Sequence, residues 1–173
     1  GNDKVFFFFF DVIKKTMNDL PKEATVGSAG LDFQADLWEI KEKFLFNSEV
    51  LKDQEGNIKG ILIMPGGRAL IPTGIYMDMP EGIYMELFVR SGHAIKLGIM
   101  SSTGVSVIDT DYHQEIGIPL TNFGDKSFFI AQGDRIAQGV FKRKLDINFE
   151  VVEDFNIQEE TRNGGYGSTN QIQ

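Results

Sequence analysis

Two carboxylates one residue apart stand at the end of a β-branched run in the segment SVIDTDY, which ends at Tyr112. A carboxylate here could act as a general base toward a water molecule, because it can accept the proton. Asp109 and Asp111 also fit a structural role, since aspartate often caps turns by accepting hydrogen bonds from backbone N–H groups. Within a strand they would share a face and repel each other. The pattern therefore predicts the tip of a hairpin, and taken alone it favours the structural role.

Two earlier segments place polar groups beside an expected strand and an expected helix. In SAGLDFQAD a glycine precedes an alternating strand that contains Asp32, although an aspartate at a turn would look the same. In VRSGHAIKLGI the side chains of Arg90 and Ser91 and the backbone N–H of Gly92 stand where a short helix begins. A helix start with a neighbouring cation and hydroxyl suits an oxygen anion, but the same residues make an ordinary helix cap.

Two later segments add further donors. In QGDRIAQGVF, Arg135 and Gln138 interrupt an otherwise apolar strand, which a solvent-facing edge would explain equally well. In RNGGYGST the glycines let backbone N–H groups approach phosphate oxygens, Ser168 and Thr169 add hydroxyl groups, and Tyr166 could stack on a base. The competing interpretation of this tail is plain disorder. Each segment taken alone therefore favours its ordinary structural explanation.

The composition indicates one soluble domain and narrows its ligands. The chain has 173 residues, 42% hydrophobic and 24% charged, which suffices for a single core. With 25 acidic against 17 basic side chains and a formal net charge of -8, its surface repels phosphate backbones, so we expect no direct nucleic-acid binding. The chain has no cysteine and 2 histidines, which excludes disulfides and zinc sites built from these residues. Any metal should be a hard cation such as magnesium, carried on a substrate's phosphates.

Short apolar runs separated by turn residues predict the framework that must position these groups. The runs recur from residues 5–13 to residues 147–152, with turn signals such as the Pro-Gly-Gly at 65–67 between them. That rhythm is typical of an all-β sandwich or barrel. Ser91–Leu97 should form the one short helix. Residues 37–63 turn charged around DQEGN, which predicts an added hairpin, or a helix and a hairpin, on the surface.

Both ends of the chain differ from this framework. Residues 5–13, VFFFFFDVI, are too short to span a bilayer and precede no small-residue cleavage site. We therefore expect neither a membrane anchor nor a secretory signal, and a cytoplasmic location by default. This run should form a strand buried on both faces and paired inside the fold or against another subunit. Residues 158–173 carry almost nothing apolar and should be a mobile tail.

Together and in this order, the five segments resemble the five ordered motifs of the trimeric dUTP pyrophosphatases, also called dUTPases. The matched segments run from about residue 24 to residue 169, and VIDTDY and GDRIAQ are the specific ones. The resemblance implies a jelly-roll-like β-barrel with one short helix, which forms a homotrimer with each active site assembled from three chains. It also implies a β domain over residues 1–157, which includes the addition at 37–63, and a flexible arm over residues 158–173 that closes the active site.

The activity that the resemblance implies is dUTP diphosphatase. Such an enzyme hydrolyses dUTP to dUMP and pyrophosphate with Mg²⁺ as cofactor, which limits uracil incorporation into DNA and supplies dUMP for dTMP synthesis. By resemblance, Asp109 is the general base that activates a water for attack on the α-phosphorus. Tyr112 packs against the deoxyribose and excludes a 2′-hydroxyl, and Asp32 contacts the magnesium through water.

The remaining substrate contacts implied by the resemblance come from three places. The hairpin backbone over residues 103–109 pairs with the uracil edge, the helix start and Gln138 hold the phosphates with support from Arg135, and the tail closes over the nucleotide. The substrate-binding residues so implied are Arg90, Ser91, Gly92, Thr103, Val107, Ile108, Tyr112, Arg135, Gln138, Arg162, Tyr166, Gly167, Ser168 and Thr169. The family needs neither histidine, so His93 and His113 are expected at the surface.

Two alternative functions remain at this point. One is a dCTP deaminase, an enzyme of the same fold, although RSGHAIKLGI fits the diphosphatase pattern better. The other is a nucleotide-binding trimer with a regulatory role, in which residues 37–63 contact a protein partner. Ammonia release from dCTP would favour the first alternative, and loss of a partner on deletion of residues 37–63 would favour the second.

Overall fold

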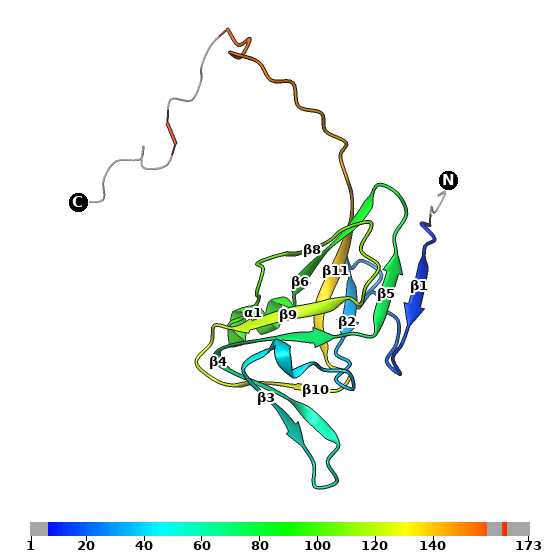
Figure 1. Ribbon diagram of the computed structural model, residues 1–173, viewed down its shortest axis with the longest axis vertical. Helices are drawn as coiled ribbons and strands as arrows, with labels where there is room; N and C mark the ends of the chain where they lie inside the picture. The colour runs from blue at the N-terminus through cyan, green and yellow to red at the C-terminus, as the bar shows by residue number, and fades with distance from the viewer. Residues whose placement is uncertain (1–6, 159–163, 166–173) are drawn as a thin grey trace, which may run out of the picture.

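Two sheets pack over one shared hydrophobic core in the computed structural model, which describes residues 7–158 and 164–165 (Figure 1). One sheet has the strand order β2-β11-β6-β8, and the other has the order β10-β4-β9-β7 with β3 also paired to β4. Strands β1 and β5 form a separate antiparallel ribbon. No helix in the described ranges is long and apolar enough to cross a membrane. The expectation of an all-β fold with one short α-helix is confirmed.

The elements of the described chain are β1 (Asp11–Lys14), β2 (Leu31–Gln34), the 3-10 helix η1 (Glu42–Phe44), β3 (Leu45–Lys52), β4 (Ile58–Pro72), β5 (Ile75–Asp78), β6 (Ile83–Val89), α1 (Ser91–Leu97), β7 (Ile99–Ser101), β8 (Ser106–Ile108), β9 (Gly117–Asn122), β10 (Phe128–Ala131) and β11 (Arg135–Arg143).

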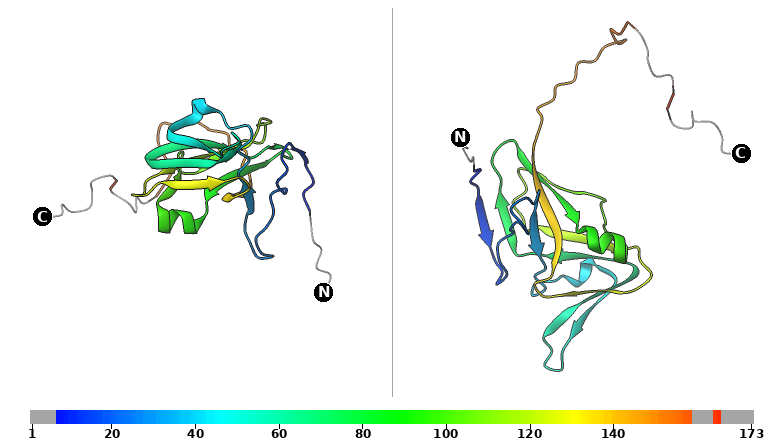
Figure 2. Two further views of the ribbon diagram at one scale, coloured as in Figure 1. Left: turned by 90° about the horizontal axis from the view of Figure 1, so that it is seen from below. Right: turned by 180° about the vertical axis from the view of Figure 1, so that it is seen from behind.

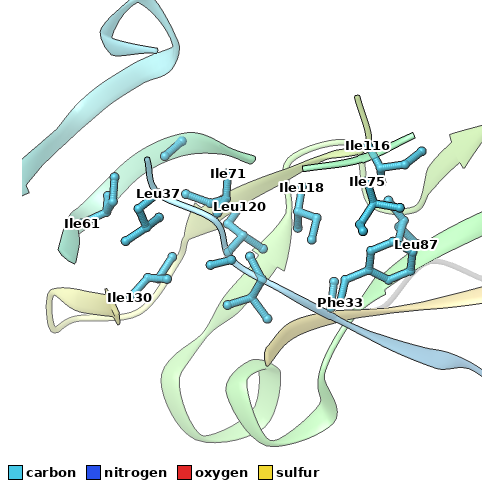
Figure 3. Packing of buried hydrophobic residues seen from close by; sticks show 14 of the residues in the cluster. Phe33, Leu37, Ile61, Ile71, Ile75, Leu87, Ile116, Ile118, Leu120 and Ile130 are labelled. Carbon is cyan, nitrogen blue, oxygen red and sulfur yellow. The ribbon is translucent and has the colours of Figure 1, made fainter. Parts of the chain in front are cut away.

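Alternation along the strands builds the core. In β6, Met85 and Leu87 are buried and the residues between and beside them are half-buried, and in β9 the same holds for Ile118 and Leu120. Side chains from both sheets meet in one cluster, as Figure 3 shows for Phe33 and Leu87 of the first sheet and Ile118 and Leu120 of the second. Burying one such side chain stabilises the fold by ~1.5–3 kcal/mol. The period of two along each strand therefore decides which face points inward.

Residues 37–63 form a 3-10 helix and a hairpin, which is one of the two forms expected. The Asp53 carboxylate stabilises the turn between β3 and β4 by accepting hydrogen bonds from two backbone N–H groups at 2.9 and 3.0 Å. The hairpin extends from the body in Figure 1. The ends of the addition lie in the core instead, where Leu37, Ile61 and Ile63 are buried. The expected surface location therefore holds only for its middle.

Strand β4 runs through the turn that was expected at residues 65–67. Its register with β3 passes from Arg68 opposite Phe46 to Ile63 opposite Ser48, so residues 64–67 bulge outward. The flanking Asn47 takes a positive φ of 44° to follow the bulge. The turn prediction is wrong because both halves of β4 stay paired, the first with β10 and the second with β9.

The N-terminal run is less buried than expected. Strand β1 pairs with β5 alone, and all four of its residues are exposed, as are Phe7, Phe8 and Phe9. The pairing inside the fold is confirmed, but the described part of this run is not buried on both faces within one chain, and its burial against another subunit stays a prediction. Of the described phenylalanines in this run, Phe10 packs against the core, with its ring centroid 5.3 Å from that of Phe141.

Residues 144–158 leave the body as an extended arm, drawn in orange in Figure 1. The arm starts with one hydrogen bond, from the Lys144 N–H to the Gly82 carbonyl at 2.8 Å. Beyond it no described strand runs beside the arm, so the strand expected over residues 147–152 is absent. Phe149 and Val151 are 93% and 98% exposed. The right panel of Figure 2 shows that the arm and the β3–β4 hairpin leave the body in opposite directions.

Candidate active site

Asp109 lies in the loop that leaves β8. The sequence predicted the tip of a hairpin here, and the hairpin is wrong because the strands on either side do not pair with each other. The Asp109 carbonyl accepts a hydrogen bond from the Tyr112 N–H at 3.1 Å, which closes the turn. The Thr110 hydroxyl donates to the Ile83 carbonyl at 2.6 Å, and the Tyr112 hydroxyl donates to the Glu115 carbonyl at 2.8 Å. These bonds fix the loop, so the Asp109 carboxylate is presented from an anchored segment.

The two strands flanking this loop do not pair with each other as a hairpin. Strand β8 pairs with β6 in the first sheet, whereas β9 pairs with β4 and β7 in the second. The connection therefore opens between the sheets. This leaves a cleft that Ile108, Tyr112 and Gly117 line together.

The expected uracil-binding backbone begins with a cluster of hydroxyl groups. The Oγ1 of Thr103 lies 2.9 Å from the Oγ of Ser106 and 3.0 Å from the Oγ of Ser101. Farther along, Val107 is exposed on the outer face of the sheet, and Ile108 packs against the core. The backbone at residues 103–108 is thus held from both sides.

The anion-binding candidates gather where α1 begins. Arg90 immediately precedes the helix, and its guanidinium donates to the Arg135 carbonyl at 3.5 Å. Ser91 and Gly92 form the exposed first residues of the helix. The helix ends at Gly98, whose left-handed φ of 72° a side chain would disfavour. The structure therefore brings Arg90, Ser91, Gly92 and Arg135 to one corner of the sheet.

Asp32 and Gln138 meet at the same corner. They lie opposite each other in the register of β2 and β11, and Gln138 also lies opposite Phe88 of β6. Gly30 permits this close pairing, because a Cβ at that position would lie 2.7 Å from the Gly139 carbonyl oxygen and 3.1 Å from the Gln138 Oε1. Asp32 is only 9% exposed, and its Oδ2 has no hydrogen-bond partner.

The unpartnered Asp32 oxygen fits a single carboxylate contact to a metal ion or to its water. Leaving a buried carboxylate oxygen without a donor is costly, so a cation-bound water would relieve it. The described part of the chain contains no group of three or more His, Cys, Asp or Glu side chains that could hold a metal ion. Among the described residues, Asp32 is therefore the candidate for a contact to a metal ion, and phosphate oxygens of a ligand would supply others.

Asp109 stands far from this corner within one chain. Ile108 lies opposite Met85 and Gln138 lies opposite Phe88, so Asp109 and Gln138 sit beside positions four residues apart on β6. At the rise of a strand this is about 13 Å along the sheet. Asp109 lines a different groove, together with Asp111, Glu86 and Arg143. The structure thus brings the phosphate-binding candidates together but not the expected base.

The two histidines differ from each other. His113 is exposed and its Nε2 lies 3.0 Å from the Asp78 Oδ1, as expected of a surface residue. His93 is half-buried, its ring contacts the Phe128 ring edge-on at 5.2 Å, and its Nδ1 is buried without a partner. Burial and the neighbouring Arg90 charge lower the pKa of His93, against an opposing effect of Asp134. The surface prediction is therefore wrong for His93.

The cleft beside Tyr112 contains residues that the sequence did not single out. Among them is Glu115, whose carboxylate accepts a hydrogen bond from the Gly74 N–H at 3.2 Å. Burial raises the pKa of Glu115, and that hydrogen bond partly opposes the shift. Phe44 and Lys41, from the addition, line the same cleft. The sequence gives no signal for this position of Glu115, because a polar residue beside an expected strand could face either the solvent or a cleft.

The tail residues Arg162, Tyr166, Gly167, Ser168 and Thr169 lie outside the described residues.

Comparison with known proteins identifies the family. A family model described as dUTPase matches residues 58–170. The deoxyuridine 5′-triphosphate nucleotidohydrolase of Finegoldia magna is 38% identical over 159 residues, which cover 91% of this chain and 96% of that protein. The enzyme of the same name from Brucella melitensis biotype 2 is 38% identical over 152 residues, covering 87% of this chain and 84% of that one.

Solved structures agree on the fold. The crystal structure of dUTPase from Streptococcus mutans superposes with a TM-score of 0.60 at 26% identity, covering 81% of this chain and 98% of that one. A Staphylococcus bacteriophage 80alpha dUTPase mutant with dUpNHpp superposes with a TM-score of 0.70 at 20% identity, covering 94% of this chain and 99% of that one. From the family model and the relatives, we conclude that this chain belongs to the dUTPase family.

Proposed function

We propose that this chain hydrolyses dUTP to dUMP and pyrophosphate, with Asp109 as the general base. The observation that carries the proposal is the corner where Asp32, Gln138 and Arg90 converge, because a triphosphate with its cation needs such a set of groups. In the cell this reaction would limit uracil incorporation into DNA and supply dUMP for dTMP synthesis. We expect it to take place in the cytoplasm.

The chemistry follows from charge and position. Asp109 accepts a proton from a water, whose oxygen attacks the α-phosphorus as the bond to the leaving pyrophosphate breaks. Magnesium, when bound, neutralises phosphate charge, and the unpartnered Asp32 oxygen would contact one of its waters. Arg90, Ser91, Gly92 and Gln138 hold the phosphate oxygens, and Arg135 supports them. These donors stabilise the charge that develops on the phosphates.

Selection of the nucleoside would occur at the connection between β8 and β9. The backbone of Thr103, Val107 and Ile108 would pair with the uracil edge. The Tyr112 ring, held by its hydroxyl on the Glu115 carbonyl, would pack on the deoxyribose and exclude a 2′-hydroxyl. A site built on such fixed groups discriminates through contacts that the wrong nucleotide cannot make.

A homotrimer would complete the site. The separation of about 13 Å along the sheet between Asp109 and Gln138 supports an arrangement in which one chain supplies the base and another the phosphate-binding corner. The exposed apolar side chains of residues 144–158 support a contact of this arm with a neighbouring chain. We further propose the division into a β domain over residues 1–157 and an arm over 158–173, in which Arg162, Tyr166, Gly167, Ser168 and Thr169 close over the nucleotide.

The test is a nucleotide panel with pyrophosphate detection. The purified chain with magnesium should release pyrophosphate from dUTP and spare dTTP, dCTP and UTP. Asp109→Asn should reduce kcat by ~10²–10⁴-fold while a non-hydrolysable dUTP analogue still binds. Asp111→Asn, two residues away, is the matched control and should retain turnover. Tight binding of dUTP with no pyrophosphate release by the unmutated chain would refute the catalytic proposal.

Experiments can distinguish two other roles from the hydrolysis of dUTP. Ammonia release from dCTP would assign the fold to deamination instead. The contact of residues 37–63 with a protein partner stays a prediction, for which the exposed hairpin is the supporting feature.

A further inference from the structure

One cleft brings the addition next to the loop that holds Tyr112. It encloses about 400 Å³, within the size range of small-molecule sites. Three segments far apart in the sequence line it: the start of the addition, the end of β4 with β5, and the loop from β8 to β9. Its lining residues are Glu39, Lys41, Phe44, Leu70, Pro72, Tyr76, Ile108, Tyr112, Gln114, Glu115 and Gly117.

The walls of this cleft suit the apolar faces of a nucleoside. Phe44, Tyr76 and Tyr112 are aromatic, and rings of this kind stack on bases and pack on sugars. Gly117 packs closely against Leu70 in this lining, because a Cβ on Gly117 would lie 2.8 Å from the Leu70 Cδ1.

Phe44 is held in place from both sides of the chain. The N–H of Phe44 donates to the Lys41 carbonyl at 3.0 Å and closes the turn of η1. The next residue, Leu45, pairs with Ala69 of β4, and Leu37 anchors the start of the segment in the core. Phe44 is 36% exposed, and the exposed part borders the cleft. The backbone that carries Phe44 is therefore fixed before any ligand arrives, and the Lys43 ammonium lies 5.0 Å from the centroid of its ring.

We propose that Phe44 is an aromatic wall of the nucleoside site and packs against the pyrimidine and deoxyribose unit that Tyr112 also contacts. The inference rests on the proposed function and extends it, since it makes the addition at residues 37–63 a part of substrate recognition. Binding energy from this wall acts equally on substrate and transition state, so it lowers KM and leaves kcat unchanged.

The chain offers a matched control two residues away. Phe46 is also a partly exposed aromatic residue on the same segment, but it does not line the cleft. Its ring lies under the Arg68 guanidinium, 4.3 Å from the centroid. Removing the two rings in turn therefore separates a role in the cleft from a general effect on the addition.

The experiment compares Phe44→Ala, Phe44→Tyr and Phe46→Ala with the unmutated trimer. Binding is measured by calorimetry with dUMP, which carries the base and sugar, and with inorganic tripolyphosphate, which carries neither. Phe44→Ala should weaken dUMP binding and raise the KM for dUTP about tenfold, as loss of one stacking contact does, with kcat and tripolyphosphate binding unchanged. Phe44→Tyr and Phe46→Ala should bind both probes as the unmutated chain does.

The outcomes separate this inference from the proposed function. If the unmutated chain hydrolyses dUTP but Phe44→Ala binds dUMP normally, the wall is refuted and the function stands. Equal weakening of dUMP and tripolyphosphate would also refute it, because that result marks a general disturbance of the site. If the unmutated chain neither hydrolyses dUTP nor binds dUMP, the proposed function fails and the inference fails with it.

Discussion

Asp109, in the loop after β8, and Gln138, in β11, lie beside opposite ends of strand β6 within one chain. Gln138 faces Phe88 in the register of β11 and β6, whereas Asp109 follows Ile108, which faces Met85. The two positions are about 13 Å apart along the sheet. In the proposed trimer, one copy of the chain would supply Asp109 and another copy would supply the corner of Asp32 and Arg90.

This arrangement predicts that two inactive variants complement each other. Asp109→Asn and Arg90→Ala should each be inactive alone. Co-expressed in equal amounts, they should recover about a quarter of the normal activity, because three-quarters of random cyclic trimers are hybrids and each hybrid holds one intact site of three. Pyrophosphate release by the whole co-expressed pool measures this, and the co-purified, doubly tagged hybrids alone should show about a third of the normal activity.

The same variants provide the control. Mixing the Asp109→Asn variant with the unmutated chain should reduce activity in proportion to the fraction of Asp109→Asn chains. When the double variant with Asp109→Asn and Arg90→Ala is co-expressed with the unmutated chain, activity should not exceed that of the sites formed by unmutated chains alone. Complete inactivity of the doubly tagged hybrids would contradict the shared site.

Tyr112 is predicted to set the preference for the deoxy sugar. Its hydroxyl is engaged on the Glu115 carbonyl, so the ring stands as a fixed wall. Tyr112→Ala should raise the kcat/KM for UTP relative to dUTP by about tenfold or more, because the excluded space opens. Tyr112→Phe keeps the ring and should retain most of the discrimination. An unchanged ratio in Tyr112→Ala would place sugar selection elsewhere.

Glu115 is predicted to make the stability of the chain depend on pH. Burial raises its pKa above the ordinary 4.5, so the folded chain binds its proton more tightly than the unfolded chain. The contribution of Glu115 to the free energy of unfolding is fully present at pH values below its ordinary pKa, and it is lost as the pH rises through its raised pKa in the folded chain. The free energy of unfolding of the unmutated chain, minus that of Glu115→Gln, should therefore fall over this window. Urea titrations at several pH values measure the difference, and a difference that rises with pH would contradict the assignment.

Among the polar residues of the described core, Asn122 is predicted to contribute most to the free energy of unfolding. Its Nδ2 donates to the Ile63 carbonyl at 2.9 Å and to the Lys126 carbonyl at 2.7 Å, and its Oδ1 accepts from the Gly124 N–H at 2.9 Å. Asn122→Ala should destabilise the fold by ~1–3 kcal/mol or more, since it leaves these groups without partners. Asn122→Asp should cost more, because a carboxylate would face two carbonyl oxygens.

The neighbouring Thr121 supplies the control for that measurement. Its hydroxyl bonds the exposed Ser102 hydroxyl at 2.7 Å, where water can replace it. Thr121→Ala should therefore change the unfolding free energy little. Denaturation should be followed at one protein concentration, because assembly shifts apparent stability. Equal effects of the Asn122 and Thr121 variants would contradict this prediction, because the buried hydrogen bonds would then stabilise the fold no more than the exposed one.

Much of the fold could be predicted because local alternation decides which face of a strand is buried. The run at Ile83–Val89 became β6 with the same bounds, and the helix formed over Ser91–Leu97 as expected. The motifs likewise pointed to the corner of Arg90, Asp32 and Gln138. Pairing partners were harder to foresee. Residues 147–152 alternate as a strand should, yet the described chain offers them no neighbour, and β8 and β9 enter different sheets although the loop between them is short.

The contribution of the addition to the cleft had no sequence signal. Phe44 stands in a charged stretch between Lys43 and Leu45, where an aromatic residue reads as an exposed or a packing side chain. Its position beside Tyr112 depends on the pairing of β3 with β4 and on the buried anchor at Leu37. Such long-range placement depends on tertiary contacts, which periodicity along the chain does not encode.

The extended arm has a consequence for each newly made copy of the chain. Its large apolar side chains are bare in the single chain, namely Leu145, Ile147, Phe149, Val151, Val152, Phe155 and Ile157. A copy that has just left the ribosome therefore offers a ribbon that proteases can cut and that sticks to other nascent chains. Because association between copies depends on their concentration, a low concentration of the chain prolongs this exposure.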